Sequence, residues 1–293
     1  MKIDPISKVL DTDDPLDIRK DNVFKAVFTK NTPESLNALS KLVSALIEKE
    51  ISVVSILANE PPPSNIHDRQ IRFDINCRTK ENELINVEMC LNPAAFEPVR
   101  LEFYVSRLFV GQDIKGSDKT YNDLKQTYQI AVLANIKFFD NEHFLHSFEY
   151  YDPKNEVSLN GKTQIITLEL SKLDSIVEKP TGDMSVSEKW AVYFEYLTNK
   201  EKRDKINEIL SNEEGIAMAS QVLMTISRDE EERARLMRDE KILLDYQSGL
   251  VHAKREGKAE KSLEVARNAL AKGYTPEAIC DLTGLDPETI ASL

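Results

Sequence analysis

The clearest pattern along the chain is a strict alternation of apolar and polar residues between positions 71 and 91. Alternation with a period of two is typical of β-strands, and Lys80, Glu81 and Asn82 in its middle are polar enough for a tight turn. We therefore predict a hairpin of two half-buried strands. Its apolar positions are Ile71, Phe73, Ile75 and Cys77 in the first strand and Ile85, Val87, Met89 and Leu91 in the second.

Helical periodicity flanks this hairpin on both sides. Residues 21–28 carry apolar side chains at helical spacing. Thr32-Pro33-Glu34 then supplies a capping hydroxyl, a proline at the first helical position and an acid in the first turn. After the hairpin, Asn92-Pro93 is predicted to start a long amphipathic helix that ends between Gly111 and Gly116.

Further strands and helices complete the predicted order of elements. Apolar and β-branched runs predict strands at 51–56, 127–139, 144–150 and 163–170, whereas nearly everything from Ser185 onward is helical and strongly charged. Residues 228–241 form a mixed-charge helix on which self-association is plausible. The pattern predicts an α/β half of about 175 residues followed by an all-helical remainder.

The last 20 residues carry sharp helix signals. Thr275-Pro276-Glu277 caps one short helix, Gly284 ends it, and Asp286-Pro287-Glu288 caps another. Two short helices around a glycine turn resemble a helix-turn-helix. The second helix has no Lys or Arg, however, so a packing or dimer-stabilising unit is favoured over a reader of DNA bases.

Composition and charge narrow the class of protein. A chain of 293 residues that is 41% hydrophobic is not disordered, and no run approaches the roughly 18 apolar residues of a membrane span. The first residues lack the apolar core of a signal peptide, and three cysteines cannot all pair. We expect a soluble, reduced, cytoplasmic protein with no membrane partner. The net charge of -12 excludes coating of nucleic acid by bulk charge, so any DNA contact must be local.

The polar positions of the hairpin include two carboxylates that are candidates for binding a metal ion. If the hairpin register is simple, Asp74 and Glu88 point the same way and approach each other. Paired carboxylate oxygens with open positions suit Mg²⁺, which also accepts oxygens from a phosphate. The alternative is an ordinary solvated strand face, on which an Asp and a Glu need no function.

Basic residues near this pair are candidates for phosphate contacts. Arg100, Tyr104 and Arg107 share one helical face, and Arg72 lies beside Asp74. The alternative for the helical arginines is salt bridging to Glu97 and Glu102, and spacing does not decide between the two. A small basic rim around the carboxylates would allow this net-acidic chain to bind DNA locally. The rim comprises Arg69, Arg72, Arg78, Arg100 and Arg107.

At these residues the sequence resembles the Rpn family of recombination-promoting nucleases and transposase-like proteins, within the PD-(D/E)xK superfamily. Asp21-Asn22-Val23-Phe24-Lys25 is similar to the family's opening helix. Arg72 to Ile75 and Asn86 to Met89 resemble the strands that carry the catalytic Asp and Glu. The remaining similar pieces are Arg100 to Arg107 with Gly111-Gln112, Gly116 and Tyr121, Gly249-Leu250 with Glu256-Gly257-Lys258, and Gly273 to Ile279 with Thr283-Gly284-Leu285.

The resemblance implies an α/β fold with a restriction-endonuclease-like core, a mixed sheet flanked by helices, followed by an all-helical C-terminal region. It implies an endonuclease that hydrolyses DNA with Mg²⁺ or Mn²⁺, acts in recombination, transposition or defence against mobile DNA, and forms a homodimer. By position, Asp74 and Glu88 would hold the metal, and Asp21 would add an acid from the first helix.

Position 90 departs from the family pattern. The superfamily places Lys there and this family commonly Gln, whereas this chain has Cys90. A neutral thiol neither supplies a fixed charge nor orients a water well. Two readings of Cys90 therefore stay open, a catalytic position and a small semi-buried residue. The alternative function is a catalytically weakened relative that acts as a DNA-binding or protein-interaction module.

Combining pattern and resemblance predicts four segments. They are an N-terminal arm at 1–20, a nuclease-like α/β domain at 21–178, a charge-rich helical region at 183–262, and a helix-turn-helix-like unit at 263–293.

Overall fold

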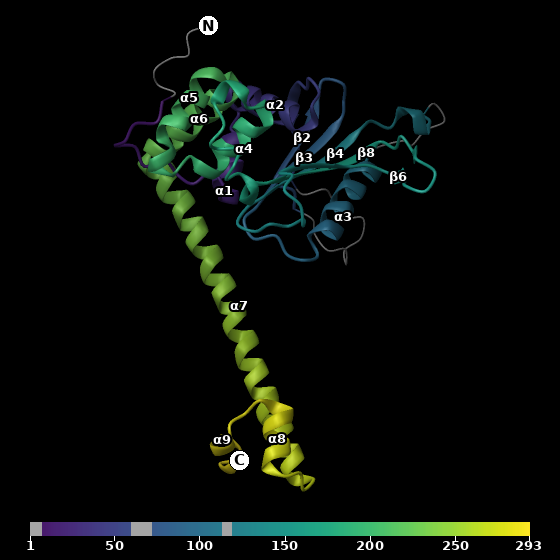
Figure 1. The fold of residues 1–293 in the computed structure, drawn as a ribbon, viewed down its shortest axis with the longest axis vertical. Helices are drawn as coiled ribbons and strands as arrows, with labels where there is room; N and C mark the ends of the chain where they lie inside the picture. The colour runs from purple at the N-terminus through teal and green to yellow at the C-terminus, as the bar shows by residue number, and fades with distance from the viewer. Residues whose placement is uncertain (1–7, 60–71, 113–118) are drawn as a thin grey trace. The chain divides into compact units, whose positions relative to one another are not determined.

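A computed structural model describes residues 8–59, 72–112 and 119–293 (Figure 1). The chain divides into two compact units, Met1–Arg233 and Ala234–Leu293. The first unit holds a sheet together with helices from both halves of the sequence, and the second is helical. The four predicted segments follow sequence pattern and family, and this division by compactness does not test them, so they stay predictions.

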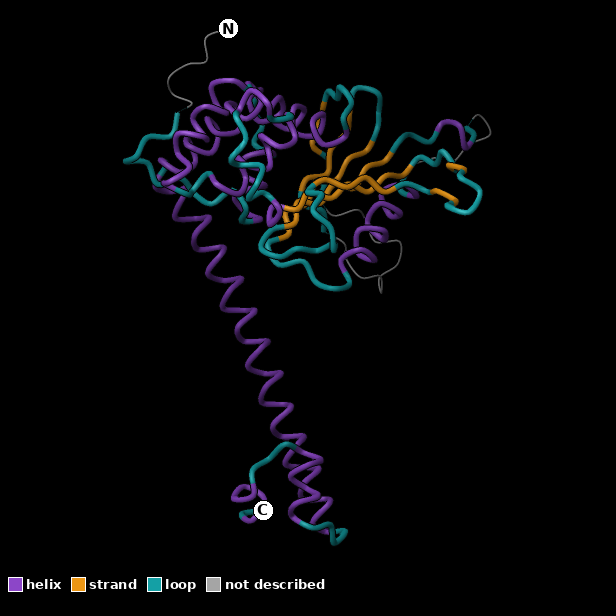
Figure 2. The backbone as a smooth tube through the Cα atoms, viewed as in Figure 1, coloured by secondary structure: helices purple, strands orange, loops and turns teal. Residues whose placement is uncertain are grey.

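The first unit is built on a mixed six-stranded sheet in the order β1-β2-β3-β4-β8-β5 (Figure 2). Strands β1, β2 and β3 pair antiparallel, β3, β4 and β8 pair parallel, and β5 pairs antiparallel with β8. The strands are β1 (Val53–Ile56), β2 (Ile75–Thr79), β3 (Leu84–Cys90), β4 (Thr127–Leu133), β5 (Leu145–Phe148) and β8 (Thr163–Glu169), and β6 (Tyr151–Asp152) pairs separately with β7 (Val157–Ser158).

The hairpin prediction is confirmed, but its half-buried character is wrong. Strands β2 and β3 pair antiparallel with Ile75 opposite Val87, as the alternation required. Every residue of β3 is buried, including Asn86 and Glu88, and Arg78 alone is exposed on β2. Helices pack on both sides of the central strands, so the polar row is covered as well. Ile71, the first residue of the predicted hairpin, lies outside the described residues.

A bundle of five helices lies at one side of the sheet, and α3 lies across the other (Figure 1). The bundle joins two N-terminal helices, α1 (Asp21–Phe28) and α2 (Pro33–Ile47), to α4 (Val186–Tyr196), α5 (Arg203–Asn212) and α6 (Glu214–Arg228). Its core contains Phe24 and Phe28 of α1 against Trp190 and Phe194 of α4, with ring centroids 4.9 to 6.4 Å apart. This aromatic cluster fixes α1 beside the sheet.

Helix α3 (Glu97–Val110) begins later than the sequence predicted. The expected start at Asn92-Pro93 is wrong, because Pro98 rather than Pro93 occupies the first turn and Phe96 is the N-cap residue. The intervening residues form a turn in which the Glu97 N–H donates to the Ala94 carbonyl. Helix α3 is the crossover between the parallel strands β3 and β4.

Two helix starts in the first unit are held by side-chain caps. The Thr32 hydroxyl accepts a hydrogen bond from the Ser35 N–H at 3.3 Å, as its Thr-Pro-Glu signal predicted. Ser185 and Glu188 form a reciprocal capping box at the start of α4. Short 3-10 turns complete the unit at η2 (Tyr121–Asp123), η3 (Leu170–Lys172), η4 (Thr181–Asp183) and η5 (Lys200–Lys202).

The second unit contains most of α7 (Glu230–Ala271) and two short helices, α8 (Pro276–Thr283) and α9 (Pro287–Ala291). Thr275 and Asp286 cap α8 and α9, and Gly284 ends α8 at φ 70°, all as predicted. Its core consists of Ala266, Ala269, Ile279 and Ile290. Within the described part of the chain, no helix is long and apolar enough to cross a membrane.

Candidate functional site

Helix α1 presents two charged residues beside the sheet because its other face is anchored in the core. Val23, Phe24, Val27 and Phe28 are buried, which leaves Asp21 and Lys25, one turn apart, on the remaining face. The Lys25 ammonium lies 2.9 Å from Asp21 Oδ2 and 2.9 Å from Asp74 Oδ1. One lysine therefore joins the first helix to the first residue of the candidate carboxylate pair.

The hairpin register brings Asp74 and Glu88 to one place. Asp74 directly precedes β2, and the pairing of Ile75 with Val87 puts it opposite Glu88 on β3. The Met89 backbone N–H donates to Asp74 Oδ2 at 3.2 Å, which fixes the carboxylate against β3. The side chain of Asp74 is 17% exposed, so it is open to solvent on one side only.

Glu88 is held from within the sheet. Its side chain is 2% exposed, and Asn86 Nδ2 donates to Glu88 Oε1 at 2.9 Å. The same amide donates to Gln129 Oε1 on β4, so a buried polar row continues across the parallel strands. Glu88 Oε2 lies 3.0 Å from Arg100 Nη2 of α3.

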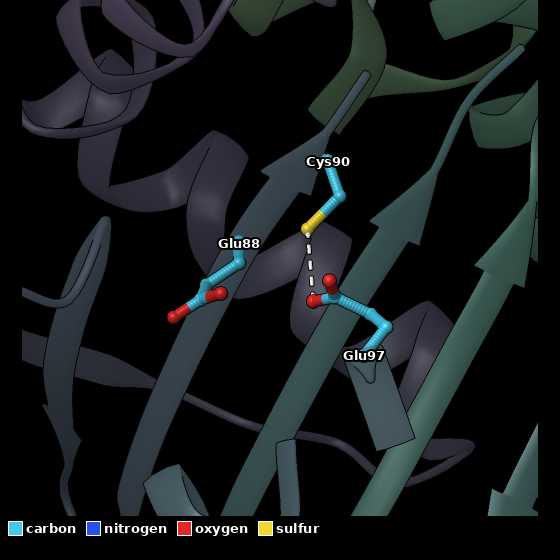
Figure 3. Close-up of side chains that lie close together, drawn as sticks. All are labelled: Glu88, Cys90 and Glu97. Carbon is cyan, nitrogen blue, oxygen red and sulfur yellow. Dashed lines mark hydrogen bonds between the residues drawn. The ribbon is translucent and has the colours of Figure 1, made fainter. Parts of the chain in front are cut away.

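A second cluster beside Glu88 consists of Glu88, Cys90 and Glu97 (Figure 3), and Arg100 contacts all three. Ligand atoms of Glu88, Cys90 and Glu97 lie within 4.8 Å of one another. Arg100 donates to Glu97 and, from Nη2, to Cys90 Sγ at 3.1 Å, while the Cys90 thiol donates to Glu97 Oε1 at 3.6 Å. One guanidinium is thus already paired with both acids of this cluster.

The electrostatics of the site show an excess of negative charge. Burial, followed by repulsion from Asp21, raises the pKa of Asp74 to about 6, and burial, followed by repulsion from Asp74, raises that of Glu88 to about 8. Burial lowers the pKa of Lys25, but attraction to Asp74 and Asp21 outweighs it, so the pKa is raised. When ionised, the four carboxyl groups (Asp21, Asp74, Glu88 and Glu97) exceed the two cations (Lys25 and Arg100) by two charges, which one divalent cation would balance.

The donor atoms fit a hard divalent cation. Asp21 Oδ1 is buried and accepts no hydrogen bond, which leaves its lone pairs for another partner. Carboxylate oxygens suit Mg²⁺ and Mn²⁺. Burial raises the pKa of the Cys90 thiol, so it remains protonated and is a poor ligand.

The residues predicted to contact phosphate differ in how closely they border the Asp74–Glu88 pair. The Arg100 guanidinium stacks on the Tyr104 ring at 5.3 Å, and Tyr104 packs edge-on against Phe73 at 5.5 Å, so both border the site. Arg72 is exposed and lines a hollow together with Lys25. Arg107 lies two turns beyond Arg100 on α3.

The predicted basic rim also includes Arg78 and Arg69. Arg78 lies four residues beyond Asp74, about 13 Å along the strand, so including it beside the carboxylates is wrong. Arg69 lies outside the described residues.

Sequence reasoning missed two charged residues that contact the pair. The sequence motif Asp21–Lys25 contains Lys25 without indicating a role for it, and the available signal is its one-turn spacing to Asp21. Helical spacing predicts Glu97 as a salt-bridge partner of Arg100, which the structure confirms, but not as a neighbour of Cys90.

Comparison with known proteins identifies a family by sequence. A family model described as PD-(D/E)XK nuclease family transposase matches residues 18–253, which include every residue of the site. No curated protein and no solved structure matched the chain.

Proposed function

The chain belongs to the PD-(D/E)XK nuclease family transposases, and from this premise we propose that it is a DNA endonuclease that depends on Mg²⁺ or Mn²⁺. The observation that carries the proposal is the buried Asp74–Glu88 pair, whose carboxyl pKa values are raised to about 6 and about 8. Carboxyl groups that lie close together, although burial and mutual repulsion disfavour their charged forms, are typical of a functional site that binds a cation. The proposed setting is recombination, transposition or defence against mobile DNA, of which the family description itself names only transposition.

Asp74 and Glu88 would hold the ion, with Asp21 completing the acidic group. When bound, a divalent ion lowers the pKa of a water ligand and neutralises charge on the scissile phosphate. The protein fixes the ligands in advance, because the Met89 N–H holds Asp74 and the Asn86 amide holds Glu88.

The neighbouring side chains would position the DNA backbone. Arg72 lines the hollow beside Asp74, and Arg100 with Tyr104 borders Glu88. Arginine binds phosphate through two parallel hydrogen bonds. We infer that Arg72 and Arg100 contact phosphates, that Tyr104 supports Arg100, and that Arg107 contacts the backbone farther along α3.

Replacing Cys90 with Ala is expected to leave metal-dependent cleavage within about tenfold of wild type. The thiol is buried and protonated and contributes neither charge nor a metal ligand. Single-turnover cleavage of a plasmid in Mn²⁺ checks this. A loss of about 100-fold or more would instead assign Cys90 a chemical role.

The proposed function is tested by incubating purified protein with supercoiled plasmid in Mg²⁺, in Mn²⁺ and in EDTA. We expect nicked or linear product with either metal and none in EDTA. Absence of cleavage with both metals would contradict the proposal and favour the alternative, a relative that binds DNA or protein without cutting. Sedimentation of the same sample tests the proposed homodimer.

A further inference from the structure

The side chain at position 90, on β3, supplies no positive charge in this chain. Cys90 is 9% exposed and its thiol donates to Glu97 while accepting from Arg100. Arg100 is in turn committed to Glu97 and Glu88. The cation that pairs with Asp74 comes from another element, the helix α1.

Lys25 of α1 is placed to supply that charge. Its ammonium is 2.9 Å from Asp74 Oδ1 and 2.9 Å from Asp21 Oδ2. An ammonium has three donors, and these two carboxylates engage two of them. The aromatic contacts of Phe24 and Phe28 hold α1 in place, so the position of Lys25 is set by the core.

The Lys25 side chain is also partly exposed. Its side chain is 22% exposed, and Lys25 lines a hollow with Ala58, Asn59 and Arg72. Two cationic side chains, Lys25 and Arg72, thus border the space beside Asp74. A phosphate diester in this hollow would lie against both of them.

We propose that Lys25, from α1, supplies a positive charge at the site and stabilises the negative charge that develops on the scissile phosphate. This inference rests on the proposed nuclease function. In the hydrolysis, a water oxygen bonds to phosphorus, the bond from phosphorus to the leaving sugar oxygen breaks, and the proton lost by water ends on that oxygen. Lys25 stays protonated throughout and donates its third hydrogen bond to a non-bridging phosphate oxygen.

The test compares Lys25→Met and Lys25→Arg with Lys30→Met as a matched control. Lys30 follows α1 and pairs with Glu232, away from the site. Two quantities are measured on each folded protein: the single-turnover rate of DNA cleavage in Mn²⁺, and the affinity for Mn²⁺ without DNA, by electron paramagnetic resonance. If Lys25→Met does not fold, Lys25→Gln takes its place.

Lys25→Met is expected to cleave about 100-fold more slowly and to bind Mn²⁺ about threefold more tightly, because a cation that repels the ion and competes for Asp74 is gone. Lys25→Arg should recover part of the rate, and Lys30→Met should match wild type. Cleavage within about threefold of wild type by Lys25→Met would overturn the proposal. Unchanged or weaker Mn²⁺ binding would also overturn it, since Lys25 would then merely hold the ligands in place.

The two proposals fail in different ways. Absence of cleavage by the wild type contradicts the nuclease function and is seen without any variant. The Mn²⁺ titration needs no cleavage, so it shows in either case whether Lys25 merely holds the metal ligands in place, which would contradict its proposed role.

Discussion

Replacing Asp74 with Asn is expected to lower the rate of Mn²⁺-dependent DNA cleavage about 1,000-fold, or about 4 kcal/mol of transition-state stabilisation. Asn keeps the shape of the side chain and can still accept the hydrogen bond that the Met89 N–H donates. It removes the charge that would hold the ion, so the affinity for Mn²⁺ should fall at least about tenfold. Single-turnover cleavage and Mn²⁺ titration measure the two effects.

The control for this variant is Asp140→Asn, an identical chemical change in an exposed turn after β4. It should cleave and bind Mn²⁺ like wild type. The unfolding temperature of Asp74→Asn should stay near that of wild type. The variant loses the ion pair with Lys25, but it also no longer buries the charge of the Asp74 carboxylate, and the two effects offset each other. Metal-dependent cleavage by Asp74→Asn at the wild-type rate would contradict the assignment of the site.

The parts of the fold that follow local rules could be predicted from the sequence. The hairpin register and the caps at Thr32, Thr275 and Asp286 depend on residues a few positions apart, and the structure confirms them. The start of α3 could not be predicted, because Pro93 and Pro98 both satisfy the rule for a first turn. Only the packing of α3 on the sheet selects Pro98.

Two features of the site could not be predicted from the sequence: which of its side chains are buried, and which charged residues pair across long sequence distances. Alternation brought Asp74 and Glu88 together, but it does not show whether the polar face is covered, and here Asn86, Glu88 and Gln129 are all buried. The contact of Lys25 with Asp74 joins a helix to a hairpin far away in the sequence. Such a contact follows from the aromatic core under α1, which no local pattern encodes.

Replacing Glu88 with Gln is expected to abolish cleavage and yet stabilise the metal-free protein above neutral pH. Gln keeps an oxygen that can accept from Asn86 Nδ2, but it supplies no charge for a divalent ion. We expect a loss of cleavage of about 1,000-fold, as for Asp74→Asn. Glu102→Gln, on the exposed face of α3, is the matched control and should remain active.

The stability effect follows from the raised pKa of Glu88. The carboxyl has a pKa of about 8 in the folded protein against an ordinary 4.5, mainly because it is buried. The folded state therefore binds the proton more tightly, its stabilisation is complete below pH 4.5, and it is lost as the pH rises towards 8. Gln resembles the protonated acid and escapes that loss. At about pH 8.5 in EDTA, the variant should unfold about 5 °C higher than wild type, a gain of about 2 kcal/mol.

The pH profile separates this cause from a general improvement in packing. Between about pH 5 and pH 8, the unfolding temperature of the metal-free wild type should fall more steeply than that of Glu88→Gln, and the two should converge in acid. Parallel profiles at a constant offset would mean that Glu88 is not protonated on folding. In Mn²⁺ at high pH, the wild type should unfold at a higher temperature than Glu88→Gln, because the wild type gains stability from binding the ion and the variant does not. A site that costs stability when empty and recovers it on binding a cation is the behaviour expected of carboxylates built to hold a metal.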